Sequence, residues 1–82
     1  MKHARQDYER IQDPLNKIGI DEPVFLVRAQ DVSAPDTVRA WARINREMGG
    51  DPNLSLLAEQ HALDMERWQN ETGKFKVADR PE

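Results

Sequence analysis

Two helix-start signals stand in the second half of the sequence, and each consists of a capping side chain followed by a proline. Segment 33–36 places a serine at the cap, a proline in the first turn and a carboxylate three residues after the cap, which is typical of a capped helix start. Segment 51–52, an aspartate and a proline, repeats the signal. Gly49 ends the first helix, and Gly73, at the left-handed capping position, ends the second. The two predicted helices cover residues 34–48 and residues from 52 to about 71.

The first part of the sequence predicts a third helix. Over residues 2–12, an alanine, Tyr8 and an isoleucine recur on one side at helical spacing. Asp13-Pro14 then ends this helix, because the residue before a proline is driven out of the α region. We expect residues 15–22 to form a loop.

Residues 24–29 are rich in β-branched and aromatic side chains, which favours a strand. The preceding residues 21–23 would also suit a helix start, so a short helix is the alternative. Residues 74–77 alternate charged and apolar side chains, as a short edge strand does. A lone central strand leaves backbone groups unpaired, so we expect residues 74–77, or a strand from another subunit, to pair with it.

These elements predict an α+β, helix-rich fold with three helices, one central short strand and a possible short C-terminal edge strand. A chain of 82 residues supports one core, so we predict a single domain over residues 1–82, with a flexible tail in the last few residues. The sequence has no cysteine for a disulfide, and 38% hydrophobic residues leave a monomer of this size little net stability. We therefore expect a homodimer or a higher oligomer.

Composition disfavours several classes of function. The polar first residues do not form a secretory signal, and the longest purely apolar run, 24–27, is far shorter than the roughly 20 residues of a membrane helix. The net charge of −3, from 12 basic and 15 acidic residues, disfavours general nucleic-acid binding. His3 and His61 lie far apart without cysteines, so we expect neither a metal nor a cofactor. The serines lack a nucleophile-elbow context, so we expect no catalysis.

The helix predicted over 34–48 carries three arginines, Arg39, Arg43 and Arg46, within one narrow stripe. The opposite side of this helix is apolar and consists of Trp41, Ile44 and Met48. A solvated outer face explains the stripe, and this is the more common arrangement. The alternative is a phosphate-binding stripe, because guanidinium groups match phosphate oxygens in bidentate geometry.

Three polar residues, Arg28, Gln30 and Asp31, stand at the end of the predicted strand, before the turn into a capped helix. Strand ends and helix starts are common places for polar groups to converge on a ligand. Arg28 and Gln30 share a face of the strand and could contact a phosphate and a base edge. The alternative is structural: Asp31 closes a turn and Arg28 pairs with a carboxylate. In the first predicted helix Arg5, Tyr8 and Gln12 lie together and could form a wall of the same pocket.

The last predicted helix has apolar residues on two sides. The main stripe consists of Leu54, Leu57, Ala58, His61, Met65 and Trp68. Because His61 sits in the middle of this stripe, we interpret it as a core residue rather than a proton shuttle. Leu56 and Leu63 lie on the opposite side, which indicates contact with a neighbouring subunit.

Four strings of the sequence, RQDYERIQDP, DEPVFLVRAQD, APDTVRAWA and GGDP, occur in this order over most of the chain. With them the chain resembles a group of small uncharacterised accessory proteins of tailed bacteriophages. The resemblance implies a protein made in the cytoplasm of an infected bacterium. The polar residues that carry over by position are Arg5, Asp7, Tyr8, Arg10, Gln12, Asp13, Arg28, Gln30 and Asp31.

Phage accessory proteins of this size include oligomeric sponges that sequester nucleotide-derived immune messengers. A sponge needs arginines for phosphates and aromatic faces for a base, without a catalytic group. The resemblance therefore implies a phosphate-bearing ligand, and the expected binding residues are Arg28, Gln30, Asp31, Tyr8, Arg5, Gln12, Arg43 and Trp41. The first alternative is an inhibitor that binds a host or defence protein through an apolar helix face. A second alternative is a small hydrolase of such messengers that uses His61 and a carboxylate.

Overall fold

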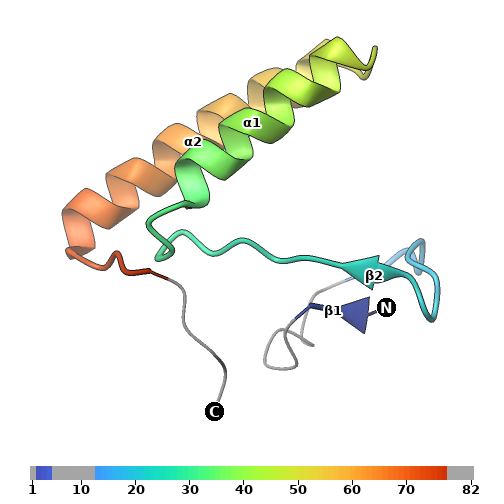
Figure 1. Cartoon of the computed structure of the whole chain (residues 1–82), viewed down its shortest axis with the longest axis horizontal. Helices are drawn as coiled ribbons and strands as arrows, with labels where there is room; N and C mark the ends of the chain where they lie inside the picture. Colours follow the sequence, from blue (N-terminus) through green and yellow to red (C-terminus); the bar gives the residue numbers. More distant parts are fainter. Residues whose placement is uncertain (1, 5–12, 78–82) are drawn as a thin grey trace. The chain divides into compact units, whose positions relative to one another are not determined.

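The computed structural model describes residues 2–4 and 13–77 (Figure 1). These residues fall into two compact units, which divide between Val27 and Arg28 and are described separately below. The single domain expected over 1–82 stays a prediction. Within the described part of the chain, no helix combines the length and the apolar character needed to cross a membrane.

The second unit contains two helices, α1 (Ala34–Glu47) and α2 (Pro52–Thr72), which lie side by side (Figure 1). Both helices predicted in this half are therefore confirmed. The Asp51 side chain caps α2 by accepting a hydrogen bond from the backbone N–H of Asn53 at 2.9 Å. Gly73 ends α2 in the left-handed conformation, with φ of 66°, as the sequence predicts. Among the described residues the structure has two helices rather than the three expected.

The predicted cap of α1 is only partly correct. Ser33 occupies the N-cap position, but its side chain makes no capping hydrogen bond. Its backbone already has α-helical angles, with φ of −81° and ψ of −11°, whereas a capping side chain normally acts from an extended residue. The first turn is held instead by the backbone, where the Ala34 N–H donates to the Asp31 carbonyl at 2.9 Å.

Small side chains fill the contact between α1 and α2. Ala42 on α1 and Ala62 on α2 are fully buried, and Met65 is nearly so. The largest fully buried side chain is that of Ser55. The apolar stripe predicted as the inner side of α2 is therefore wrong, apart from Met65. His61 is exposed, so its interpretation as a core residue is wrong as well.

A hydrogen-bond network closes the hairpin near its turn. The Asn45 side-chain amide donates to Ser55 Oγ at 2.9 Å and to the Asp51 carbonyl at 3.2 Å. Ser55 Oγ in turn donates to the Ala42 carbonyl of α1 at 3.0 Å. The buried hydroxyl thus has partners on both sides, which a close approach of two helices requires.

The segment after α2 returns to the residues that precede α1. Lys76 forms an isolated parallel bridge with Asp31, and its N–H donates to the Gln30 carbonyl at 2.9 Å. The Gln69 side chain donates to the carbonyls of Ala29 and Asp31 at 2.7 and 3.1 Å. The C-terminal segment therefore pairs with residues 30–32, and the expected pairing with a strand over 24–29 is wrong.

The first unit contains two short strands, β1 (Lys2–His3) and β2 (Pro23–Val24), which pair in parallel. β2 is the start of the predicted strand over 24–29, but regular structure ends at Val24. A turn in which the Asp31 N–H donates to the Arg28 carbonyl lies at the far end of the predicted strand. The third helix cannot begin at residue 2, because residues 2–3 are β1; residues 5–12 lie outside the described residues.

Candidate binding surface

One side of the hairpin is joined by ion pairs. Arg39 and Arg46 of α1 bond to Glu66 and Glu59 of α2, respectively. The hydrogen bond to Glu66, together with the charges of Glu66 and Asp36, raises the pKa of Arg39 despite partial desolvation. Arg43 lies on the same side and pairs within its own helix, with its Nε 3.7 Å from Glu47 Oε1. We call this side the charged flank.

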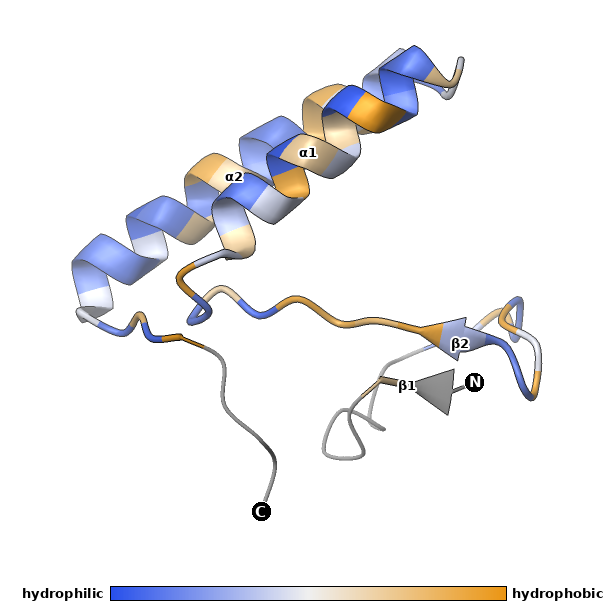
Figure 2. Cartoon of the chain, viewed as in Figure 1, coloured by the Kyte–Doolittle hydropathy of each residue, from blue (hydrophilic) through white to orange (hydrophobic). Residues whose placement is uncertain are grey.

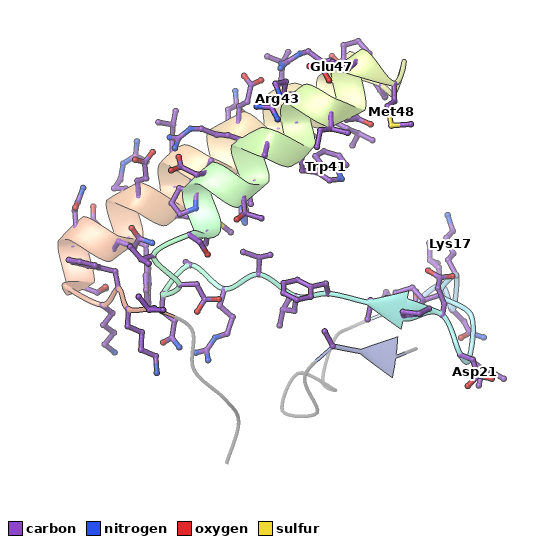
Figure 3. All side chains as sticks on the ribbon, in the orientation of Figure 1. Lys17, Asp21, Trp41, Arg43, Glu47 and Met48 are labelled. Atoms are coloured by element: carbon purple, nitrogen blue, oxygen red, sulfur yellow. The ribbon has the colours of Figure 1, made fainter. Side chains whose placement is uncertain are left out.

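The opposite side of the hairpin is apolar, and we call it the apolar flank. Its members are Trp41, Ile44 and Met48 of α1 and Leu54, Leu57 and Trp68 of α2. Helical geometry puts these residues on one side, since at 100° per residue they all fall away from the positions whose ion pairs join the two helices. Figure 3 shows Trp41 and Met48 projecting from α1 away from Arg43 and Glu47. Figure 2 shows hydrophobic positions on both helices among largely hydrophilic ones.

In most helix pairs large apolar side chains are buried, but on this side of the hairpin large apolar side chains are exposed. Met48 is 82% exposed, Leu57 60% and Trp41 50%, while alanines and a serine occupy the contact between the helices. Full burial of a large apolar side chain contributes roughly 1.5–3 kcal/mol to the free energy of unfolding. The partly exposed side chains of the apolar flank contribute less than this. Exposed apolar side chains that gather in a patch are a common feature of interaction surfaces.

Two further leucines, Leu56 and Leu63, lie on the charged flank. Each is about half exposed, like the leucines of the apolar flank. They stand among ion-paired side chains rather than in an apolar cluster. The side of α2 predicted to meet a neighbouring subunit is therefore the less apolar of the two.

The expected phosphate-binding residues occupy separate places. Arg28 and Gln30 belong to the turn before α1, and the strand face that they were expected to share is absent there. Asp31 is buried, and its carbonyl accepts from Ala34 and Gln69. On α1, Arg43 lies on the charged flank and Trp41 on the apolar flank (Figure 3). The remaining three expected residues, Arg5, Tyr8 and Gln12, lie outside the described residues.

The described residues contain no cluster of three or more histidine, cysteine, aspartate or glutamate side chains that could hold a metal ion. Comparison of the chain with protein-family models, curated proteins and solved structures finds no match. The apolar flank offers aromatic and aliphatic side chains, and the exposed His61 belongs to the same helix, α2.

The spacing of small residues in the sequence indicates which sides of the two helices meet, and therefore which large side chains are left exposed. Pro35 and Ala42 of α1 stand seven residues apart, as do Ser55 and Ala62 of α2. All four are buried. A seven-residue spacing keeps positions on one side of a helix, so small residues at that spacing indicate a close helix contact and direct the large side chains outward.

Proposed function

We propose that this protein acts without catalysis, by binding another polypeptide through the apolar flank. The observation that carries the proposal is the exposure of Trp41, Met48 and Leu57 on one side of a hairpin whose fully buried side chains are small, the largest being that of Ser55. Tryptophan and methionine are enriched in protein interfaces, and an apolar helix side is what an amphipathic helix of a partner binds.

The chemistry of the surroundings supports a protein partner over a nucleotide. A phosphate-bearing ligand needs several cationic donors directed at one place. The arginines of the charged flank already bond to glutamates, two of them across the helix pair. The expected nucleotide-binding residues that are described divide between a turn and two opposite flanks. Sequestration of a messenger stays a prediction, which the experiment below tests.

The resemblance to phage accessory proteins suggests the setting of this activity. An inhibitor made in the cytoplasm of an infected bacterium would bind a host or defence protein and block one of its surfaces. A surface carried on two helices suits this role, because side chains held on helices lose less conformational freedom on binding than those of an unfolded segment.

The experiment compares two adjacent leucines of α2 with matched exposure. Leu57→Glu places a carboxylate on the apolar flank, and Leu56→Glu places one on the charged flank. Purified variants are titrated by calorimetry with a leucine-rich amphipathic helical peptide that carries lysines on its polar side. We expect the wild type and Leu56→Glu to bind the peptide and Leu57→Glu to bind at least about tenfold more weakly, since a buried carboxylate without a partner is costly.

A parallel thermal melt tests the alternative ligand. Cyclic dinucleotides and ADP-ribose derivatives are added to the wild type, because a ligand that prefers the folded state raises the melting temperature by mass action. We expect no shift. Equal peptide affinity of the two leucine variants would show that the apolar flank does not bind the peptide. A rise in melting temperature with a nucleotide would favour sequestration of a messenger over protein binding.

A further inference from the structure

The second unit has a small core of its own. Its fully buried side chains are small, the largest being that of Ser55. Small domains without disulfides or metals depend on large buried apolar side chains or on assembly for their stability. Six of the large apolar side chains of this hairpin are on the apolar flank, so covering that flank would add to its stability.

The area of the apolar flank matches what a stable dimer needs. Two tryptophans and four other apolar side chains, which are between 38% and 82% exposed, offer on the order of 600 Å² per chain, since one aromatic side chain alone can bury about 150–250 Å². A standard interface buries about 800 Å² per partner, of which the fully buried centre is the apolar part. Polar side chains at the edge would supply the rest.

The charges of the hairpin allow two copies to meet on this side. The glutamates and arginines that join the helices lie on the charged flank and are already bonded to one another within one chain. The charged residue nearest to this side is Asp64 of α2, seven residues after Leu57, and it pairs with Arg67 of the same helix at 3.2 Å. Pairing of two apolar flanks therefore leaves the ion pairs that join the helices outside the contact, with the Asp64–Arg67 pair at its edge.

We propose that the apolar flank binds the apolar flank of a second copy, so that two hairpins form a symmetric four-helix assembly with the charged flanks outside. This inference rests on the proposed function, because it takes the apolar flank as the polypeptide-binding surface and names its occupant in the purified protein. A host partner would then bind by replacing one copy, and its apparent affinity would fall as the concentration of this protein rises.

The test is the mass in solution, measured by sedimentation velocity over a dilution series. We expect a dimer of the wild type and of Leu56→Glu at micromolar concentration. Leu57→Glu should raise the dimer dissociation constant by at least about a hundredfold, because the symmetric interface contains the substituted residue twice. A monomeric wild type, or equal dimerisation of the two variants, would overturn the inference.

A second measurement covers the case in which Leu57→Glu does not fold. Because dimerisation stabilises the folded chain by mass action, the melting temperature of the wild type should rise with protein concentration. A concentration-independent melting temperature would overturn the inference. If the wild type is a monomer that binds the amphipathic peptide, and Leu57→Glu no longer binds it, then dimerisation through the apolar flank is wrong and the proposed function stays in place.

Discussion

At the scale of single residues, the hairpin depends on two glycines that play different roles. Gly49 has φ of 80°, a left-handed conformation that follows the end of α1. Gly50 is required for space, because a Cβ atom there would lie 1.9 Å from the side-chain oxygen of Asn45. The sequence predicts the first role from its position after the helix, but a close approach between a glycine and an asparagine side chain has no sequence signal.

Replacement of Gly50 by alanine should displace the Asn45 side chain and break its hydrogen bond to Ser55. The expected loss of unfolding free energy is about 1–2 kcal/mol, since a partly buried hydrogen bond is lost. Urea denaturation measures it. Gly49→Ala is the comparison, because a Cβ there meets nothing within 4 Å and costs only the left-handed conformation, about 1 kcal/mol. Wild-type stability of Gly50→Ala would contradict the described network.

Ser55 tests the close contact between the helices. Ser55→Ala should cost about 1 kcal/mol, because the hydrogen bond to the Ala42 carbonyl is lost while the space stays filled. Ser55→Leu should cost more, about 3 kcal/mol, because a fully buried position cannot receive a larger side chain without separating the helices. Calorimetric melting of both variants checks the order, and a stable Ser55→Leu would show that the contact is loose.

At the scale of elements, sequence reasoning located both long helices and misjudged their orientation. The caps and glycines of α1 and α2 act locally, so their positions follow from the sequence. Which side of each helix faces the other depends on a contact between distant residues, and here alanine and serine form it instead of leucine and tryptophan. The short strands were mispredicted for the same reason, since pairing partners such as Lys76 and Asp31 are far apart in sequence.

Charge reversal tests the orientation of α1 on α2. Glu66→Lys should remove the bond to Arg39 and lower stability by less than about 1 kcal/mol, because half-exposed ion pairs contribute little. The double variant Arg39→Glu with Glu66→Lys should recover part of this loss at low salt. Chemical denaturation of the wild type, the two single variants and the double variant forms a double-mutant cycle. A coupling energy of zero at low salt would contradict the pairing of these two residues.

At the scale of the whole molecule, a small core between the two helices contrasts with the exposed apolar side chains of the apolar flank. The sequence suggests that a chain of 82 residues without cysteine needs help to be stable, and this stays a prediction. The seven-residue spacing of small residues indicates which sides of α1 and α2 meet, but the flank on which the exposed side chains of the two helices gather depends on how the helices pack. In the proposed assembly, a second copy and a protein partner would compete for the same residues of the apolar flank.

Hydroxyl-radical footprinting of the wild type at two protein concentrations tests the apolar flank most directly, because it needs no substitution. At high concentration we expect Trp41, Met48 and Trp68 to be modified several-fold more slowly than in dilute solution, as a second copy covers them. Leu56 and Leu63, on the charged flank, should react equally at both concentrations. Equal modification of Trp41, Met48 and Trp68 at the two concentrations would contradict the account.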